Sequence, residues 1–149
     1  MMRNTHTRPL LRFPEFNEEW KSFYGNELFE PISNKNHNSD LPILAISQEF
    51  GAVPRDLINY QISVTDKSVS SYKVVEKGDF IISLRSFQGG IEYSEYNGIC
   101  SPAYIILRPK REIEDYFFKH YLKTFRYIQH LQSKFRYLIL PHLLQVESN

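Results

Sequence analysis

Residues 72–91 read YKVVEKGDFIISLRSFQGGI, and this stretch decides the fold that we expect. Phe80 to Leu84 is a short apolar run that follows the turn sequence Lys77-Gly78-Asp79, which predicts a strand. A second predicted strand begins at Gly90 and runs to Tyr96. The polar loop between the two strands therefore lies at the end of a rigid sheet, and it carries Arg85, Ser86, Gln88 and Gly89.

The side chains of this loop are suited to reading DNA base edges. Arg85 has the forked donors that pair with guanine, Gln88 has the amide that pairs with adenine, and a serine hydroxyl suits either base. Gly89 and its neighbour Gly90 permit close approach of the backbone to a ligand. An ordinary β-turn with a solvated arginine and glutamine remains the alternative interpretation.

Two more polar clusters flank predicted strands. The segment 47–55 contains Gln48 and Arg55 and includes a glycine turn. The segment 68–73 contains Ser70, Tyr72 and Lys73, and hydroxyl groups with a lysine are typical of phosphate contacts. Three such clusters in one predominantly β region fit a sheet that presents loops to a duplex.

The fold class that follows is α+β, a mainly antiparallel twisted sheet with an amphipathic helix packed on it. Pro42 to Glu49 predicts a strand that ends at Gly51 and Pro54. Residues 90–96 and 99–107 predict a hairpin across Asn97-Gly98, a strong turn signal. Residues 1–19 are polar and contain two prolines, which predicts an irregular arm, and residues 20–149 then form one recognition domain.

The helical period begins near residue 114 and extends to Arg136. Its apolar residues recur at helical spacing and predict an aromatic face packed on the sheet. Lys119, Lys123, Arg126, His130 and Lys134 fall on the opposite side, which predicts a basic stripe that faces outward. Lysine and arginine outnumber acidic residues between Arg108 and Arg136, as in a patch that meets phosphates or an acidic partner.

Composition and motifs argue against intrinsic catalysis. The chain has 149 residues, 15% of them aromatic, and a formal net charge of +1. Its histidines and the single Cys100 lack the spacing of metal ligands, and its carboxylates occur singly rather than in the clusters that hold Mg²⁺. We therefore expect no enzyme activity, no cofactor and no metal. One cysteine and no apolar membrane span predict a soluble protein of the reducing cytoplasm.

Several of these motifs together resemble the target recognition domain of Type I restriction–modification specificity subunits. The resemblance covers about Arg8 to Arg136, and it rests on the segments 48–55, 72–80, 83–90 and 96–104 together with the opening RPLLRFPEF and Trp20. It implies a non-catalytic subunit that reads one half of a split duplex target. In that family, a second recognition domain reads the other half.

The resemblance also implies partners. A methyltransferase subunit, which uses S-adenosylmethionine, and a restriction subunit would be directed to the site by this domain. Members of the family continue into a Pro-rich segment and a long helix, whereas this chain ends at Asn149. We therefore expect a half-subunit, a truncated product or an isolated domain, which would bind DNA weakly because it makes few phosphate contacts.

Two other functions remain open. The basic, aromatic helix could dock an acidic protein partner, in which case the polar loops are incidental. The chain could instead bind single-stranded DNA by stacking bases on Tyr93, Tyr96 and Tyr104. Both alternatives depend on whether these side chains are exposed.

Overall fold

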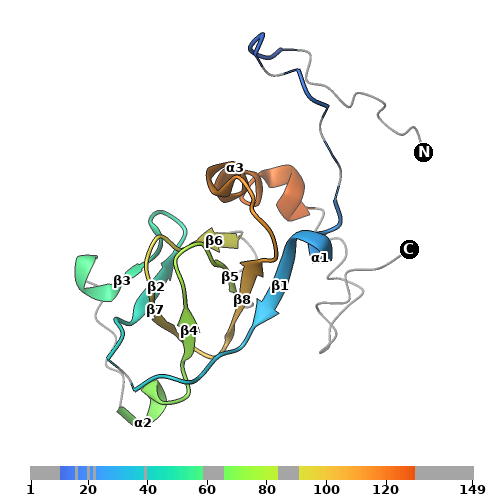
Figure 1. Cartoon of the computed structure of the whole chain (residues 1–149). Helices are drawn as coiled ribbons and strands as arrows, with labels where there is room; N and C mark the ends of the chain where they lie inside the picture. The colour runs from blue at the N-terminus through green and yellow to red at the C-terminus, as the bar shows by residue number, and fades with distance from the viewer. Residues whose placement is uncertain are drawn as a thin grey trace.

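The computed structural model describes residues 11–15, 17–19, 21, 23–38, 40–58, 66–83 and 91–129. It confirms the α+β class, since mostly antiparallel strands are combined with short helices (Figure 1). The elements are α1 (Gly25–Leu28), β1 (Phe29–Ile32), β2 (Leu44–Ser47), β3 (Gly51–Pro54), the 3₁₀ turn η1 (Arg55–Leu57), α2 (Asp66–Val69), β4 (Lys73–Val75), β5 (Phe80–Ser83), β6 (Ile91–Tyr93), β7 (Gly98–Cys100), β8 (Tyr104–Pro109) and α3 (Asp115–Tyr121).

The largest sheet has the strand order β1-β8-β5-β6, and every pair in it is antiparallel. Two smaller antiparallel pairs, β2-β3 and β4-β7, complete the β structure. Ile82 of β5 lies opposite Ile91 of β6. The Arg85 loop joins these two strands and lies outside the described residues.

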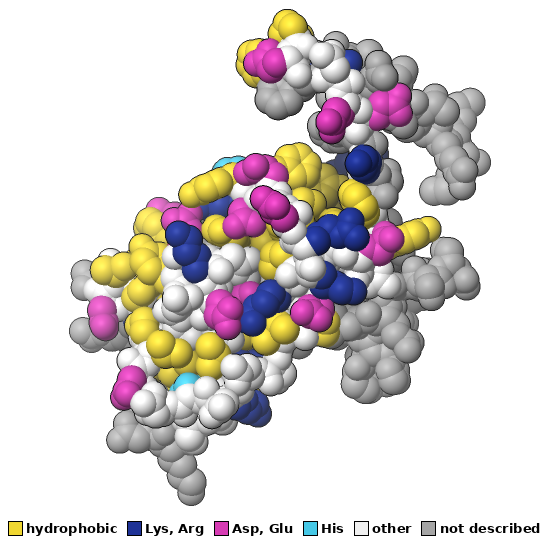
Figure 2. Space-filling model, in the orientation of Figure 1, with side chains coloured by type: hydrophobic (Ala, Val, Ile, Leu, Met, Phe, Trp, Pro, Cys, Tyr) yellow, Lys and Arg dark blue, Asp and Glu magenta, His cyan; other side chains and the backbone are white. Residues whose placement is uncertain are grey.

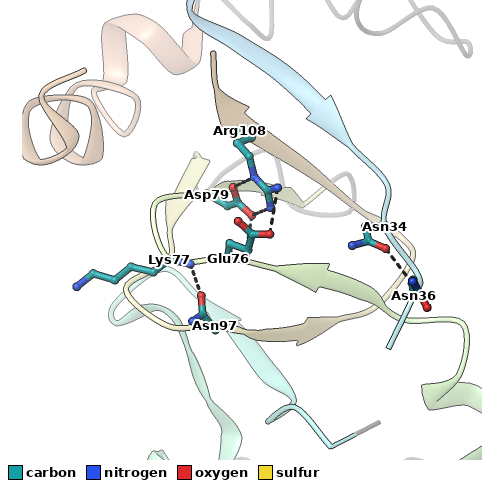
Figure 3. Close-up of polar contacts among 7 residues, drawn as sticks. All are labelled: Asn34, Asn36, Glu76, Lys77, Asp79, Asn97 and Arg108. Carbon is teal, nitrogen blue, oxygen red and sulfur yellow. Dashed lines mark hydrogen bonds and ion pairs between the residues drawn. The ribbon is translucent and has the colours of Figure 1, made fainter. Parts of the chain in front are cut away.

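The predicted hairpin across Asn97-Gly98 is wrong, because β6 pairs with β5 whereas β7 pairs with β4. Both turn residues make tertiary contacts instead. The Asn97 side-chain oxygen accepts a hydrogen bond of 2.8 Å from the Lys77 backbone N–H (Figure 3). A Cβ on Gly98 would lie 2.6 Å from the Pro42 carbonyl oxygen, so glycine is needed there for close packing.

The predicted end of the first strand is also partly wrong. Residues 44–47 form β2 as expected, but Gly51–Pro54 forms β3 and pairs back on β2. The backbone of Gly51 has φ +74°, which only glycine adopts easily, so this residue turns the chain between two strands instead of ending the β structure.

Two hydrophobic clusters cover the two faces of the large sheet, as the alternation along β5 predicts. Phe80 and Ile82 pack on the side of α3, where they meet Leu122. Ile81 points to the other side and packs against residues of β2, β3, β4 and β7. Cys100 is fully buried in this second cluster, and burial raises its pKa to about 12.

A buried ion pair fastens the turn before β5 to β8 (Figure 3). Arg108 donates to both carboxylate oxygens of Asp79, at 2.8 and 2.9 Å, and Asp79 is 1% exposed. The same carboxylate accepts the backbone N–H of Glu76 at 2.8 Å. Asp79 therefore has more than the turn role that its sequence context suggests.

The predicted continuous helix 115–136 is interrupted. Residues 122–124 are a turn, and the chain is helical again over 125–129, beyond which it is not described. Thr124 explains the break, because its hydroxyl donates to the Tyr121 carbonyl oxygen at 2.8 Å and accepts from the Tyr127 N–H at 3.3 Å. Such side-chain bonds cap a new helical segment.

The outward basic stripe is also wrong for its first two lysines. Lys119 pairs with Glu95 at 2.6 Å and Lys123 pairs with Glu92 at 2.8 Å. Aromatic side chains take the exposed positions instead, namely Tyr116, Phe117, Tyr121 and Phe125. Phe118 and Leu122 do pack on the sheet, so the predicted aromatic packing holds for only part of the helix.

The remaining elements agree with the sequence in part. Within 11–19, the described residues form no helix or strand, and Leu11 and Phe13 are exposed. Two short helical segments, α1 and α2, precede β1 and β4 respectively. In the described part of the chain, no helix has the length and apolar character that crossing a membrane requires.

Candidate nucleic-acid interface

The backbone of the turn between β2 and β3 is held by short-range contacts. The Ser47 hydroxyl accepts hydrogen bonds from the backbone N–H groups of Glu49 and Phe50, both at 3.2 Å. A Cβ on Gly51 would lie 2.8 Å from the Tyr93 carbonyl oxygen, so the end of the turn is pressed against β6. These contacts are those of a rigid turn rather than of a loose loop.

A long-range contact holds the same turn from outside. Lys123, in the turn after α3, donates to the Gln48 carbonyl oxygen at 2.6 Å and to the Glu92 carboxylate at 2.8 Å. Glu92 is 4% exposed, and its other carboxylate oxygen has no hydrogen-bond partner among the described residues. Burial raises the pKa of Glu92, and the hydrogen bond and charge of Lys123 partly offset this rise.

The side chains of the turn point to solvent. Gln48 and Glu49 are exposed, and the Phe50 ring is 56% exposed. We name residues 48–50 the recognition turn. It presents an amide, a carboxylate and an apolar ring, which are groups that contact adenine, cytosine and the thymine methyl respectively in the DNA major groove.

A hollow of about 150 Å³ lies beside the recognition turn. Phe50 and Tyr96 contribute aromatic walls, and the ion pair of Lys119 with Glu95 contributes polar ones. Tyr93 also lines the hollow, and its hydroxyl donates to Asp115 at 2.8 Å. Burial is the largest cause that raises the pKa of Tyr93, and this hydrogen bond raises it further, so the hydroxyl stays protonated.

The structure separates the two predicted site residues of the segment 47–55. Gln48 lies in the turn at one end of the β2–β3 hairpin. Arg55 follows β3 at the other end, where its backbone N–H donates to the Ile43 carbonyl oxygen at 3.0 Å. Sequence proximity in a hairpin is thus misleading, because Ser47 pairs with Gly51 while Leu44 pairs with Pro54.

The structure instead brings the polar cluster of residues 68–73 close to the end of β5, after which the Arg85 loop begins. The Lys73 ammonium donates to the Tyr104 carbonyl oxygen at 2.8 Å, and Tyr104 lies opposite Ser83, the last residue of β5. Ser70 is exposed nearby in sequence, whereas the Tyr72 side chain is 8% exposed and packs with Val69. Tyr72 is therefore a packed residue of this region rather than an exposed one.

Four of the predicted site residues, namely Arg85, Ser86, Gln88 and Gly89, lie outside the described part of the chain.

The described surface has no strong basic excess. Acidic residues outnumber lysine and arginine among the described residues. Figure 2 shows the two kinds of charge interspersed on one face. Further lysine and arginine residues offset this acidic excess in the full sequence. They include Arg3, Arg8, Arg85, Lys134 and Arg136, which all lie in the segments that are not described.

The structure brings to this site three residues that the sequence did not single out, Glu49, Phe50 and Glu92, and also Lys123, which was expected on the outward basic stripe instead. Glu49 and Phe50 lie within the polar segment 47–55. An exposed phenylalanine in a turn between two strands would have been the signal for them. Glu92 and Lys123 are 31 positions apart and are joined only by the tertiary fold. No local pattern could have paired them.

The alternative of base stacking finds less support in the described residues. For base stacking, Tyr93 is buried and Tyr104 is half-buried against the core, which leaves Tyr96 as the exposed one of the three. Among the residues that the structure describes, no three or more His, Cys, Asp or Glu side chains gather as metal ligands would.

Comparison of the chain with protein-family models, curated proteins and solved structures finds no match.

Proposed function

We propose that this protein is a non-catalytic, sequence-specific duplex-DNA recognition domain of a cytoplasmic Type I restriction–modification system. In this role it directs a methyltransferase subunit and a restriction subunit to one half of a split target site. The motif resemblance described above supports the family. The recognition turn supports base reading by this chain.

The observation that carries the proposal is a rigid turn with outward polar side chains. Base reading requires side chains whose position is set before the DNA arrives, because ordering them on binding costs free energy. Ser47 and Lys123 hold the backbone of the recognition turn, while Gln48 and Glu49 remain exposed. The exposed groups are therefore available for base edges without rearrangement of the backbone.

The experiment is selection from a randomised duplex pool at low salt, with the wild-type chain, Gln48→Ala and Arg85→Ala. The wild type should enrich a short motif. Gln48→Ala should relax the choice at one base pair, because a good bidentate pair supplies about 1–3 kcal/mol of discrimination. Arg85→Ala should relax the choice at a different position of the same motif.

Asn26→Ala is the matched control for Gln48→Ala. Asn26 is an exposed amide in α1, far from the β2–β3 hairpin in Figure 1, and its replacement should leave the motif unchanged. Salt-sensitive binding without any enriched motif would overturn base reading by the isolated chain. A motif that both Gln48→Ala and Arg85→Ala leave intact would overturn the assignment of the reading residues.

A second candidate function is docking of a protein partner through the α3 region. The exposed rings of Tyr116, Phe117, Tyr121 and Phe125 favour it, and the Phe125 side chain is 75% exposed. The partner that these residues suit is apolar rather than acidic, because Lys119 and Lys123 are already paired with Glu95 and Glu92. Loss of partner capture in Phe125→Ser, with base selection intact, would separate this function from DNA reading.

A further inference from the structure

We infer that Lys123, held by Glu92, is the positioning residue of the recognition turn. It has no direct part in base reading. Through the Gln48 carbonyl it fixes the backbone that carries Gln48, Glu49 and Phe50. The role in base choice rests on the proposed function, whereas the coupling between Lys123 and the turn is independent of it.

The geometry makes Lys123 the bridge between two parts of the fold. Its ammonium lies 2.6 Å from the Gln48 carbonyl oxygen and 2.8 Å from the Glu92 carboxylate. Gln48 belongs to the β2–β3 hairpin, and Glu92 belongs to β6 in the large sheet. One ammonium group therefore ties the recognition turn to the sheet and to the segment that follows α3.

Glu92 sets the position of the ammonium. By strand alternation its side chain points away from the face that holds Ile91 and Tyr93, and Glu92 is almost fully buried. A buried carboxylate is a strong acceptor for an ammonium, and charge-assisted bonds of this kind are shorter and stronger than neutral ones. The other carboxylate oxygen of Glu92 has no hydrogen-bond partner among the described residues. Lys123 is therefore the main group that compensates the charge of Glu92 there.

The neighbouring lysine does not share this arrangement. Lys119 also forms an ion pair, at 2.6 Å, but its partner is the exposed Glu95, and no hydrogen bond of Lys119 to the recognition turn is observed among the described residues. Lys119 instead lies over the rings of Tyr93 and Tyr116, at 5.7 and 5.3 Å. It is thus a matched control of the same residue type one turn earlier.

The consequence for recognition is a change of base choice without a change of general affinity. Lys123 contacts the turn through the Gln48 backbone carbonyl. Replacing Lys123 therefore keeps the Gln48 side-chain amide but frees the backbone that orients it. Binding to phosphates depends on exposed cations and should be unaffected. The expected signature is a relaxed motif with an unaltered salt dependence.

The test measures the turn itself before it measures DNA. Amide hydrogen exchange of Glu49 and Phe50 in the full chain reports local opening of the turn. In Lys123→Met, exchange at both amides should rise by about tenfold or more, the effect expected from losing a charge-assisted hydrogen bond. Lys123→Arg should restore much of the protection, and Lys119→Met should leave it unchanged.

Glu92→Gln is the second variant, in case the methionine variant fails to fold. It keeps the shape of the side chain but removes the charge that holds Lys123, so exchange should rise there too. Unchanged exchange in the folded variants would overturn the inference whatever the DNA results are. Faster exchange together with wild-type base choice would overturn the positioning role in recognition.

The same variants then enter the duplex selection. A relaxed motif in Lys123→Met and its recovery in Lys123→Arg would support the whole inference. If the wild-type chain enriches no motif at all, the proposed function fails. The exchange data would then still decide whether Lys123 positions the turn.

Discussion

Two turns of this molecule, residues 76–79 and 47–51, have the same components but serve the chain differently. Each contains a glycine with positive φ, Gly78 at +99° and Gly51 at +74°. Each is also fastened by a buried carboxylate paired with a cation, Asp79 with Arg108 and Glu92 with Lys123. The two turns differ in the number of hydrogen-bond partners that each carboxylate has.

Asp79 uses both of its oxygens, whereas Glu92 uses one. Arg108 binds Asp79 in a bidentate manner and the Glu76 N–H adds a third bond, so the charge is fully compensated. Lys123 makes a single bond to Glu92, and the remaining oxygen has no partner among the described residues. A fully compensated pair fixes the fold, while an incompletely compensated pair holds a local feature with exposed side chains.

The largest expected effect is the loss of the Asp79 pair. Asp79→Asn should destabilise the protein by about 3–5 kcal/mol, because it leaves the partly buried Arg108 guanidinium without its counter-charge. Denaturant unfolding measures this change. Cys100 gives a second readout, since its buried thiol should react with a labelling reagent only when the fold opens.

Glu76→Gln is the control for that variant. The Glu76 side chain is 56% exposed and lies 3.2 Å from Arg108, so its loss should cost less than about 1 kcal/mol. Equal stability of Asp79→Asn and the wild type would remove the distinction between the two turns.

The second effect concerns Gly51. Gly51→Ala should destabilise the protein by about 1–3 kcal/mol, because alanine is strained at positive φ. Its Cβ would also meet the Tyr93 carbonyl oxygen at 2.8 Å. Gly25→Ala is the control, since Gly25 lies in α1 and nothing lies within 4 Å of a Cβ placed there. Thermal unfolding of both variants measures the difference, and equal melting temperatures would contradict a rigid β2–β3 turn.

The third effect is a pH dependence that Glu92 should confer. Its pKa in the folded protein is raised above the ordinary value of 4.5, so the folded state binds the proton more tightly than the unfolded state. Stability from this group is therefore fully present below 4.5 and is lost as the pH rises through the folded pKa. Stability curves of wild type and Glu92→Gln should diverge over that window, with the wild type falling relative to the variant.

A wild type that gains stability relative to Glu92→Gln with rising pH would show that Lys123 outweighs burial, and the two turns would then be alike.

The smallest effect is expected for the exposed ion pair of Lys119 and Glu95. Their side chains are 33% and 42% exposed, so solvent screens the attraction between them. Lys119→Met should change the free energy of unfolding by less than about 1 kcal/mol. Denaturant unfolding in low and high salt measures this change, and a large effect would mean that the hollow beside the recognition turn is more important to the fold than its exposure indicates.

Local patterns in the sequence predicted much of this architecture. The alternation along residues 80–83 predicted which side chains face each core, and the strand at 44–47 and the turn before Phe80 were found from apolar runs and glycine. The α+β class followed from the change of period near residue 114. These features depend on neighbours in the chain, which a sequence displays directly.

Predictions that depended on partners far along the chain were less successful. Asn97-Gly98 has the residues of a hairpin turn, but its side-chain oxygen and its missing Cβ serve Lys77 and Pro42 instead. The helix from residue 115 kept its period through Leu122, yet Thr124 ended the first segment with its hydroxyl. The outward basic stripe failed because Glu92 and Glu95 bind two of its lysines.

The sequence by itself thus determined the class of fold, the faces of the central strand and the polar composition of the loops. Only the tertiary structure decided that Gln48 and Arg55 lie at opposite ends of a hairpin and that Lys123 holds the recognition turn. The physical reason is that propensity and periodicity act over a few residues. Buried charges, in contrast, must find partners wherever the fold brings them, as Glu92 finds Lys123 and Asp79 finds Arg108.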